Sequence, residues 1–595
     1  MKAPPELSQD KAAPKWMAAV VDKSLLLSLI PFAFLAWFVA ECGVNVPFLD
    51  QWGLPWVFEG VKHGDFSGIL AFNNEHRIIV PRLIWTALAF LDSWNVKVEM
   101  FVSVIFTLAM FIGMTWRVRE ESDGASHVSP DLTLFVSSLV LCAFVQWDTY
   151  LWGFQFSFVL VNVCVVFGIL ILSSPRIEFR RKLIFAGLCC LIASFSSLQG
   201  LLSWFVMLPC LLLLFHKTKG RIVAGLIVAA IFGVVAVVYQ IGYVRGTVLV
   251  PPLTLLPSKQ FVLFFLSLAG GPLAQGLAVA PPNAAATIGG VLVGGFVILI
   301  ALSIHARQYS RAAPWIAIGL LSLGFDTITS IGRASWGWQI AVTMSRYMSI
   351  TVLLTVAVLQ MLRQWGELRP AYKNWIAFFA GGIALLSITG SARGLSKGYE
   401  LKQARSDAAG FMEVLPYIDP KTDAYPESCI FPLFDLAGYT KWVRQPAMIL
   451  NNLGFRKIVS NAEFVEHPST FFGSFDVPEE TNGPAILGAD SQVRASGWAV
   501  IPNRAELPKI VMISVGQQRL FITGAGVGTI DRPDIAKYYK NPKYLRCGWS
   551  VQIPAKFLPE GDSVLRAWVF DEQTKQFIEL LDPHGVSKRI IKKSK

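Results

Sequence analysis

The residues best suited to chemistry stand beside long apolar stretches of the chain. Asp50 follows the first apolar segment, Leu25–Ala40, and precedes the amphipathic stretch Gln51–His63. A carboxylate at a membrane–water boundary can act as a general base that takes the proton of a reacting hydroxyl group. Aspartate is also a favoured helix N-cap, so Asp50 can instead serve only to begin the helix that follows it.

Charged residues form a second group of candidates. Glu75-His76-Arg77 lies further along the same connecting segment, and Arg333 and Arg346 flank later apolar stretches. Arginine binds a phosphate group with two parallel hydrogen bonds, so these arginines, together with His76, are candidates for holding an anionic group. Each has a plainer alternative. Arginines at helix ends snorkel toward lipid head groups, and a histidine is commonly a structural hydrogen-bonding group.

Three further polar residues complete the set of candidates. Asp148 lies within the short connection Gln146–Phe154, Gln155 follows it directly, and Asp326 lies about one turn inside an apolar stretch. An ionisable residue within a membrane span is a functional candidate by default. Asp326 can equally be a structural partner of Arg333, which stands about two helical turns further along.

The stretches that must position these residues are predicted to be membrane helices. The chain of 595 residues is 54% hydrophobic and only 15% charged, whereas soluble domains carry roughly 25% charged residues. Five runs lack Lys, Arg, Asp and Glu and approach the ~20 residues that span a bilayer. These runs are Met100–Trp116, Leu132–Val145, Phe156–Leu172, Ile222–Tyr239 and Trp375–Ile388. Leu25–Ala40 is predicted to be a retained first span, because no small-x-small cleavage site follows it closely.

Basic residues cluster in short connections at alternate ends of these stretches. The clusters are Arg117 with Arg119, Arg176–Lys182, Lys217–Arg221, Arg307 with Arg311, and Arg363–Lys373. Positive loops mark the cytoplasmic side, so these connections and the N-terminus are predicted to be cytoplasmic. The opposite connections then face outward, as does everything after Ile388. They are Val44–Lys97, Gln146–Phe154, Ser196–Gly200, Tyr243–Ala285 and Gly332–Tyr347. We therefore predict an integral plasma (inner) membrane protein with about eleven spans.

The first outward connection, residues 44–97, is long, and long ordered loops are usually functional. Within it, Gly64-Asp65 is a turn signal that ends the amphipathic stretch. Ile78–Phe90 is apolar, but a crossing here would place Arg117 outside, so we expect a helix at the outer membrane surface. Phe261–Leu273 is assigned outside the membrane as well.

Beyond Ile388 the sequence predicts an extracytoplasmic domain in two parts. Residues 391–485 combine a polar, helix-prone stretch, Arg393–Ala409, with short apolar patches broken by Pro and Gly, which is typical of small helices. Residues 486–585 contain strand-like runs separated by turn residues. The runs are Val493–Ile501, Lys509–Val515, Gln518–Thr523, Trp549–Ile553 and Ser563–Asp571.

Two segments of this region echo one another, Gly497-Trp498-Ala499-Val500 and Gly548-Trp549-Ser550-Val551. The echo predicts paired strands of a β-sandwich. Sandwiches of this kind often bind carbohydrate through exposed Trp and Tyr, although a buried core position is commoner for Trp. The basic tail, residues 586–595, is expected to be disordered or to touch anionic lipid.

The net charge of +12 is explained by cytoplasmic loops, so we do not expect nucleic acid as a partner. The eight cysteines show no metal-ligand spacing, and most of them lie in apolar runs. Cys429 and Cys547 lie in the outer region, where an oxidising compartment permits a disulfide that the sequence alone does not establish.

The order of features around Asp50 resembles the GT-C superfamily of membrane glycosyltransferases, most nearly its branch of aminoarabinose transferases and protein O-mannosyltransferases. In that branch an acidic residue follows the first span, and an amphipathic helix, a Gly-Asp turn and a charged cluster come next. Asp50, Gly64-Asp65 and Glu75-His76-Arg77 match these positions in order. The chain carries Gln51 where the branch commonly has a second acidic residue, and His-Arg where it has Lys-Pro. The likeness covers residues 1–390, the expected catalytic domain.

The resemblance implies transfer of a sugar from a polyprenyl-phosphate donor to a glycan, lipid or protein acceptor outside the cytoplasm. It implies that Asp50 is the catalytic base, that Asp148 is a second acidic site residue, and that Arg346-Tyr347 binds the lipid phosphate. Because Gln51 replaces an acidic residue, no metal site is assigned, and a divalent metal ion stays open as a cofactor.

Three other functions compete with this one. A transporter or flippase predicts facing charges near the bilayer midplane in repeated halves, and no internal repeat is evident in the sequence. A polymerase or ligase of lipid-linked saccharides typically carries its large loop late in the chain. A receptor is the last alternative, although eleven spans exceed what an anchor needs.

Overall fold

The computed structural model describes residues 23–121, 130–215, 217–243, 258–277, 282–434, 438, 440–477, 485–488, 490–502, 504, 506–582 and 588–593. The chain divides into two compact units. We call Met1–Gly43, Ile69–Ile84 and Lys97–Gly398 the membrane unit, and Val44–Gly68, Trp85–Val96 and Tyr399–Lys595 the C-terminal unit. The outward connection 44–97 is thus divided between the two units.

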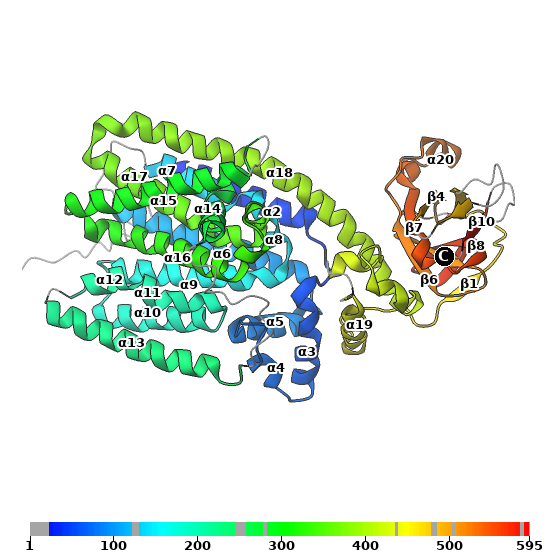
Figure 1. Cartoon of the computed structure of the whole chain (residues 1–595), viewed down its shortest axis with the longest axis horizontal. Coiled ribbons are helices and arrows are strands. Elements are labelled where there is room, and N and C mark those ends of the chain that lie inside the picture. The colour runs from blue at the N-terminus through cyan, green and yellow to red at the C-terminus, as the bar shows by residue number, and fades with distance from the viewer. Residues whose placement is uncertain are drawn as a thin grey trace, which may run out of the picture. The chain divides into compact units, whose positions relative to one another are not determined.

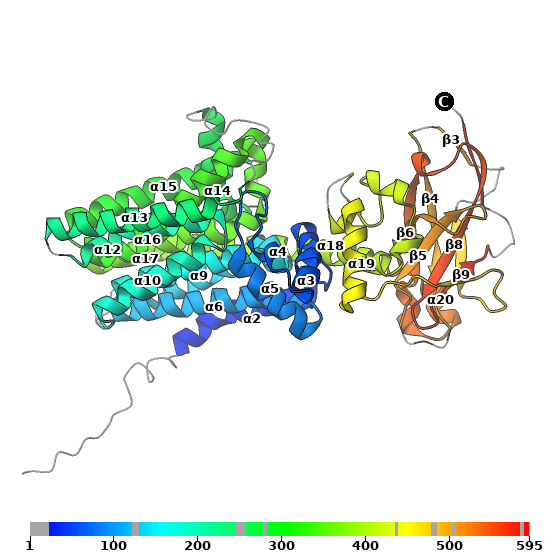
Figure 2. The same cartoon turned by 90° about the horizontal axis from the view of Figure 1, so that it is seen from below.

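The membrane unit is a bundle of helices, of which α9, α10, α13, α16 and α17 run lengthwise in both views (Figures 1 and 2). Within the described residues, eight helical segments are long and apolar enough to cross a membrane. They contain α6 (Val96–Glu121), α7 (Pro130–Leu141), α9 (Phe156–Ser173), α13 (Thr218–Gln240), α15 (Pro282–His305), α16 (Tyr309–Arg333), α17 (Met348–Leu368) and α18 (Lys373–Glu413). The other helices include α2 (Lys23–Cys42), α10 (Phe179–Ser194), α11 (Ser203–Val206), α12 (Leu208–Leu213) and α14 (Lys259–Ala274). Helices suit lipid because they satisfy every backbone polar group within the segment.

Helix α14 packs closely along α15. A Cβ atom on Gly270 would overlap the carbonyl oxygen of Ala285, and one on Gly289 would overlap that of Leu266. Close backbone approach at small residues is the usual packing of helix pairs in membranes. The position of this helix outside the membrane, and with it the count of about eleven spans, stays a prediction.

The connection 44–97 contains a series of short helices: η2 (Leu49–Gly53), α3 (Leu54–Lys62), α4 (Ser67–Leu70) and α5 (Ile79–Asp92). Gly64 has a positive φ of 83° directly after α3, which confirms the predicted turn. The carboxylate of Asp65 accepts the Ser67 amide at 2.8 Å, and this hydrogen bond lowers the pKa of Asp65. Helix α5 has 14 residues and is about 21 Å long, too short for a bilayer core of ~30 Å.

The first part of the C-terminal unit contains helices, as the sequence predicts, but strands already begin at Glu463, Gly473 and Ala485, before the predicted start of the sandwich at residue 486. Helix α18 runs without a break over 41 residues, so it contains Arg393–Ala409 and does not end near Ile388. Helix α19 (Lys441–Leu453) follows, with 3-10 turns before it. The indole N–H of Trp52 donates to the carbonyl oxygen of Leu433 at 3.2 Å, which fastens the start of the connection 44–97 to this region.

The second part of the C-terminal unit is a β-sandwich. A seven-stranded sheet has the order β1-β9-β8-β10-β3, with β5 paired to β8 and β6 to β5, and a three-stranded sheet has the order β2-β4-β7. The strands are β1 (Glu463–Val465), β2 (Gly473–Val477), β3 (Ala485–Leu487), β4 (Gln492–Ala499), β5 (Ile510–Val515), β6 (Phe521–Gly526), β7 (Gly548–Pro554), β8 (Gly561–Asp571), β9 (Gln576–Leu580) and β10 (Lys588–Lys592). Side chains from both sheets, among them Trp549 and Ile513, fill one core.

The echo between the two Gly-Trp segments is confirmed as a strand pair. Strands β4 and β7 are antiparallel, with Gly497 opposite Trp549 and Trp498 opposite Gly548. The Trp549 ring is fully buried. It therefore fills the core and does not present a face to sugar.

The structure corrects the expectation for the basic tail. Lys588–Lys592 forms β10, which pairs with β8 and β3. Alternation explains the difference: Ile590 is 1% exposed and enters the core, while Arg589 points outward. The ammonium of Lys588 lies 6.0 Å from the ring of Phe475, so even this lysine belongs to the folded domain.

Candidate functional site

Several predicted outward connections meet at one end of the membrane unit. The hydroxyl of Ser197 lies 3.3 Å from the ring nitrogen Nδ1 of His76, and the carboxylate of Glu75 lies 3.6 Å from the guanidinium of Arg333. These residues come from the connections 44–97, 196–200 and 332–347. The contacts confirm that the three connections share one end of the bundle. Which side of the membrane this end faces stays a prediction.

Three aromatic rings gather at the same place. The Phe158 ring of α9 lies 6.3 Å from His76, 6.2 Å from Phe325 of α16 and 6.5 Å from Tyr347. The guanidinium of Arg346 lies 5.2 Å from the Tyr347 ring. We call this cluster, with the charged residues around it, the aromatic end; it comprises Glu75, His76, Phe158, Phe325, Arg333, Arg346 and Tyr347.

His76 is held in one tautomer. The backbone amide of Leu198 donates to Nδ1 at 3.2 Å, which requires that Nδ1 carry no proton. The neutral ring then carries its proton on Nε2, 3.7 Å from the carboxylate of Glu75. Burial lowers the pKa of His76, Glu75 opposes that shift, and Arg333 adds to it. The geometry therefore makes His76 a neutral hydrogen-bond donor, whereas the sequence suggested a cation.

Arg77 is occupied by structural contacts. Its amide donates to the Tyr239 hydroxyl at 2.9 Å, its guanidinium donates to the carbonyl oxygen of Ile241, and the same group lies 4.4 Å from the Phe72 ring. The side chain is buried. Arg77 thus fastens the connection 44–97 to the end of α13, and this leaves it poorly placed to receive a phosphate.

Arg333 and Arg346 are more exposed than Arg77. Arg333 stacks on Trp336 at 4.7 Å in addition to its contact with Glu75, and its side chain is 32% exposed. Arg346 is half-buried. Cations that stack on aromatic rings at a partly exposed site can still form charge-assisted hydrogen bonds to an incoming anion.

Asp148 lies on a segment that adjoins Arg346. The amide of Asp148, in the short helix α8 (Trp147–Leu151), donates to the hydroxyl of Ser345 at 3.1 Å. The hydroxyl of Thr149 donates to the carbonyl oxygen of Arg346 at 3.5 Å. These hydrogen bonds hold the connection 146–154 against η9 (Ser345–Tyr347). Asp148 and Arg346 therefore both lie at or beside the aromatic end.

Asp326 lies inside the bundle and is fully buried. The hydroxyl of Thr351 lies 3.2 Å from its Oδ1, while Oδ2 is buried without a hydrogen-bond partner in the part of the chain that the structure describes. The alternative of an Asp326–Arg333 ion pair is wrong, because Arg333 reaches Glu75 instead. Gln155 is also buried, and its Oε1 likewise lacks a partner among the described residues.

Asp50 belongs to the C-terminal unit and is exposed in η2. The residue before it, Leu49, has a positive φ of 45°, a conformation that costs a leucine about 1–2 kcal/mol. Helix α3 begins after its N-cap Gly53, so the side chain of Asp50 does not cap that helix. Gln51, which stands where the family resemblance places an acidic residue, is buried, and its side chain accepts the Phe48 amide at 3.2 Å.

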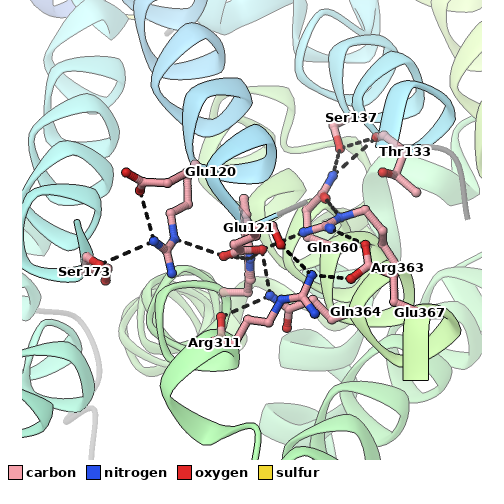
Figure 3. Close-up of polar contacts among 12 residues, drawn as sticks. Glu120, Glu121, Thr133, Ser137, Ser173, Arg311, Gln360, Arg363, Gln364 and Glu367 are labelled. Atoms are coloured by element: carbon pink, nitrogen blue, oxygen red, sulfur yellow. Dashed lines mark hydrogen bonds and ion pairs between the residues drawn. The ribbon is translucent and has the colours of Figure 1, made fainter. Parts of the chain in front are cut away.

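A second charged cluster lies where α6, α16 and α17 meet, and Figure 3 shows its contacts. Arg363 is fully buried and contacts Glu121 at 2.6 Å and Glu367 at 2.7 Å. Arg117 contacts Glu121 at 2.9 Å, and Arg311 pairs with Glu367. We call this cluster the ion-pair end; it comprises Arg117, Glu120, Glu121, Arg311, Arg363 and Glu367.

The ion-pair end joins three of the basic clusters assigned to the cytoplasm, which confirms that they share one end of the bundle. The three arginines of the cluster are balanced by its three glutamates, and Glu120 contacts Arg117 at 3.2 Å and, outside the cluster, Arg176 at 3.1 Å. Buried ions need such mutual pairing to offset the cost of leaving water. The cluster therefore holds helices together and presents no open charge to a ligand.

Among the described residues, no group of three or more His, Cys, Asp or Glu side chains is arranged to hold a metal ion. Cys429 and Cys547 are free thiols.

Sequence reasoning missed the aromatic partners of the site. Phe158 and Phe325 lie within apolar runs, where nothing distinguishes them from other core residues. Ser197 and Leu198 stand in a connection that was assigned outward, and its position was the signal that could have drawn attention to them. Only the packing of α9 against α16 brings these residues to His76.

No protein-family model matches the chain, and no curated protein matches it. Among solved structures, the crystal structure of ArnT from Cupriavidus metallidurans bound to undecaprenyl phosphate is similar over 74% of this chain and 88% of that one, with a TM-score of 0.36 and 12% identity. A likeness at this level does not establish a shared fold or activity.

Proposed function

We propose that the chain is a membrane glycosyltransferase that moves a sugar from a polyprenyl-phosphate donor to an acceptor outside the cytoplasm. The observation that carries the proposal is the aromatic end, where Arg333 and Arg346 stack on aromatic rings beside His76 and Glu75. Aromatic side chains with a few convergent polar groups are the usual lining of small-molecule sites. The cations suit an anionic leaving group.

The chemistry divides among the candidate residues. The acceptor hydroxyl oxygen attacks the anomeric carbon of the sugar, and the bond from that carbon to the phosphate oxygen breaks. Asp50 takes the proton of the hydroxyl group, and Arg346 neutralises the departing phosphate through charge-assisted hydrogen bonds. His76 donates from Nε2 to a sugar or phosphate oxygen, because Leu198 holds it neutral. The strained Leu49 supports a functional role for Asp50, since such strain concentrates at active sites.

The direct test is Asp50→Asn. We expect sugar transfer to fall by at least ~10², the lower range for a lost general base, while the protein stays folded in the membrane. Asp65→Asn is the matched control, because this exposed carboxylate lies in the same connection and an asparagine there can still accept the Ser67 amide. Near-normal turnover by Asp50→Asn at wild-type expression would refute the assignment of the base.

The proposed orientation has its own test. Tyr538 is 78% exposed in the C-terminal unit, and Lys219 is exposed at a predicted cytoplasmic connection. A cysteine at position 538 should react with a membrane-impermeant thiol reagent in intact cells, and a cysteine at position 219 should react only after lysis. The reverse pattern would invert the whole topology.

A transporter is the second candidate, and the buried Asp326 favours it, because an intramembrane carboxylate is a frequent proton relay. The two functions differ in what Asp326→Asn does. A transferase in which Asp326 only supports Thr351 tolerates the substitution, since asparagine keeps an oxygen for that contact. In a proton-coupled transporter, the same substitution would abolish the coupling of substrate uptake to proton movement. Measuring sugar transfer and substrate uptake in the same proteoliposomes separates the two.

A further inference from the structure

A groove lies between α15, α17 and α18, far from the aromatic end. It has a volume of about 340 Å³ and an apolar lining that includes Gly295, Leu302, Val358 and Phe379. Only 22% of the apolar stretch of α15 and 28% of the apolar stretch of α18 are buried inside the protein. Both helices therefore present most of their apolar surface to lipid. The groove is therefore open to the bilayer.

The dimensions of the groove match one leaflet of the membrane. Its lining on α15 runs from Val291 to Leu302, which is about 17 Å of helix. The hydrocarbon core of a bilayer is about 30 Å thick, so the groove reaches from one surface to near the midplane. A single acyl chain has this reach, whereas a transmembrane helix of a partner would need the full thickness.

One end of the groove is polar. A smaller pocket lined by Ser303, Gln308 and Arg311 shares Leu299 and Trp365 with the groove, so the two lie side by side. Ordered contacts already hold Arg311 at this place, since it pairs with Glu367 and donates to the carbonyl oxygen of Glu121 at 3.1 Å. The polar pocket thus has a rigid wall that belongs to the ion-pair end.

Cations and interfacial aromatics surround that polar end. Helix α15 ends just before Arg307, α17 ends just before Arg369, and α18 begins at Lys373, and all three cations are exposed. Tyr372 and Trp375 line the groove there. Tryptophan and tyrosine mark the head-group level of membrane proteins, and basic residues between membrane helices bind anionic head groups.

We propose that this groove binds one acyl chain of an anionic phospholipid, with the head group between Arg307, Arg369 and Lys373. The site is separate from the proposed sugar-transfer site, because Val358–Trp365 lies 11–18 residues along α17 from Tyr347, roughly 17–27 Å of helix rise. The proposal does not depend on which side of the membrane this end faces. The bound phospholipid would come from the surrounding bilayer, and the proposed sugar-transfer reaction would not consume it.

Two glycines of α15 and two cations near the polar end provide variants that test the groove and the head-group site separately. A Cβ atom on Gly295 meets nothing within 4 Å, and Gly295 lines the groove, so Gly295→Leu should fill the groove without strain. Gly290 also has open space for a Cβ atom but is not a lining residue, which makes Gly290→Leu the matched control. Arg369→Gln with Lys373→Gln removes two head-group cations while keeping the groove.

The experiment is a titration of the purified, delipidated full-length protein with phosphatidylglycerol and with phosphatidylcholine of the same chains, read by native mass spectrometry. We expect the wild type and Gly290→Leu to retain one phosphatidylglycerol tightly, and Gly295→Leu to lose it. Each removed cation should weaken phosphatidylglycerol about fivefold and leave phosphatidylcholine unchanged.

Three results would overturn the proposal. Equal retention of phosphatidylglycerol by Gly295→Leu and Gly290→Leu would mean that the groove is not the site. Equal binding of the two lipids, insensitive to the loss of both cations, would mean that no head group is recognised. A dimer that Gly295→Leu converts to a monomer would mean that a second copy of the chain fills the groove.

Discussion

The two ends of the membrane unit use α16 and α17 in opposite ways. At the ion-pair end Arg363 is fully buried, and its guanidinium contacts two carboxylates at 2.6 and 2.7 Å. At the aromatic end Arg333 is 32% exposed, lies 3.6 Å from Glu75 and stacks on Trp336. An arginine is thus buried and tightly paired at one end of these helices, and partly exposed with a longer ion pair at the other.

The difference indicates which end serves stability and which serves binding. Buried charges that neutralise one another hold helices in register, and removing one partner leaves an uncompensated charge. A partly exposed cation with a longer ion pair contributes little to stability and can exchange its partner for an anionic ligand. Substitutions at the ion-pair end should therefore change folding, and substitutions at the aromatic end should change activity.

Breaking the ion-pair end should give the largest effect. Arg363→Ala leaves Glu121 and Glu367 buried with one cation fewer, and we expect the free energy of unfolding to fall by about 3–5 kcal/mol. Unfolding in mixed detergent–SDS micelles measures it. Arg181→Ala is the control, because this side chain is 71% exposed and contacts Glu178 at 3.6 Å, so its effect should stay within ±0.5 kcal/mol. Equal stability of both variants would remove the structural role of the ion-pair end.

At the aromatic end, Arg346→Ala should lower the maximal rate of sugar transfer by about 10², since charge on the leaving phosphate grows in the transition state. Arg346→Lys should recover only part of the rate, because lysine keeps the charge without the planar pair of donors. Initial rates against donor concentration in detergent provide the measurement. If Arg346→Ala resembles the wild type while Arg333→Ala is folded and inactive, the two arginines exchange roles.

The pH dependence of His76 sharpens the comparison. Burial lowers its pKa, so the unfolded chain binds the proton more readily. Its contribution to stability is complete above the ordinary pKa of about 6.5 and is lost as the pH falls through the lowered value. His76→Gln should remove this loss of stability at acidic pH, because glutamine does not titrate. Its side chain can still accept the Leu198 amide and donate in place of Nε2. Unfolding midpoints between neutral and acidic pH test it, with the exposed His63→Gln as control. An unchanged pH profile in His76→Gln would place the titration elsewhere.

The smallest expected effect is at the Glu75–Arg333 pair. Both side chains are more than 30% exposed and their charged atoms lie 3.6 Å apart, so the coupling energy should not exceed about 1 kcal/mol. A double-mutant cycle with Glu75→Gln and Arg333→Gln measures it as unfolding free energy. A coupling as large as that expected of Arg363 would make the aromatic end a second structural lock and erase the contrast between the two ends.

Local patterns in the chain were enough to predict much of this architecture. Apolar runs predicted the long helices, and Gly64-Asp65 predicted the turn after α3, because only the glycine adopts its positive φ without strain. The repeated Gly-Trp pattern predicted that β4 and β7 pair. Loop charges correctly grouped Arg117, Arg311 and Arg363 at one end of the bundle. Each of these signals is recognised within a short stretch of sequence, even where it relates two distant stretches.

Partner choice required the tertiary structure. The sequence by itself determined that basic residues stand at helix ends, but only packing decided that Arg363 is neutralised by Glu121, 242 positions away, and that Arg333 pairs with Glu75 and not with Asp326. Packing also decided that Lys588–Lys592 is a strand, because its backbone pairs with β8 on one side and with β3 on the other. Hydropathy and turn chemistry are local properties, whereas the partner of a charge is set by which helix ends and strand edges meet in space.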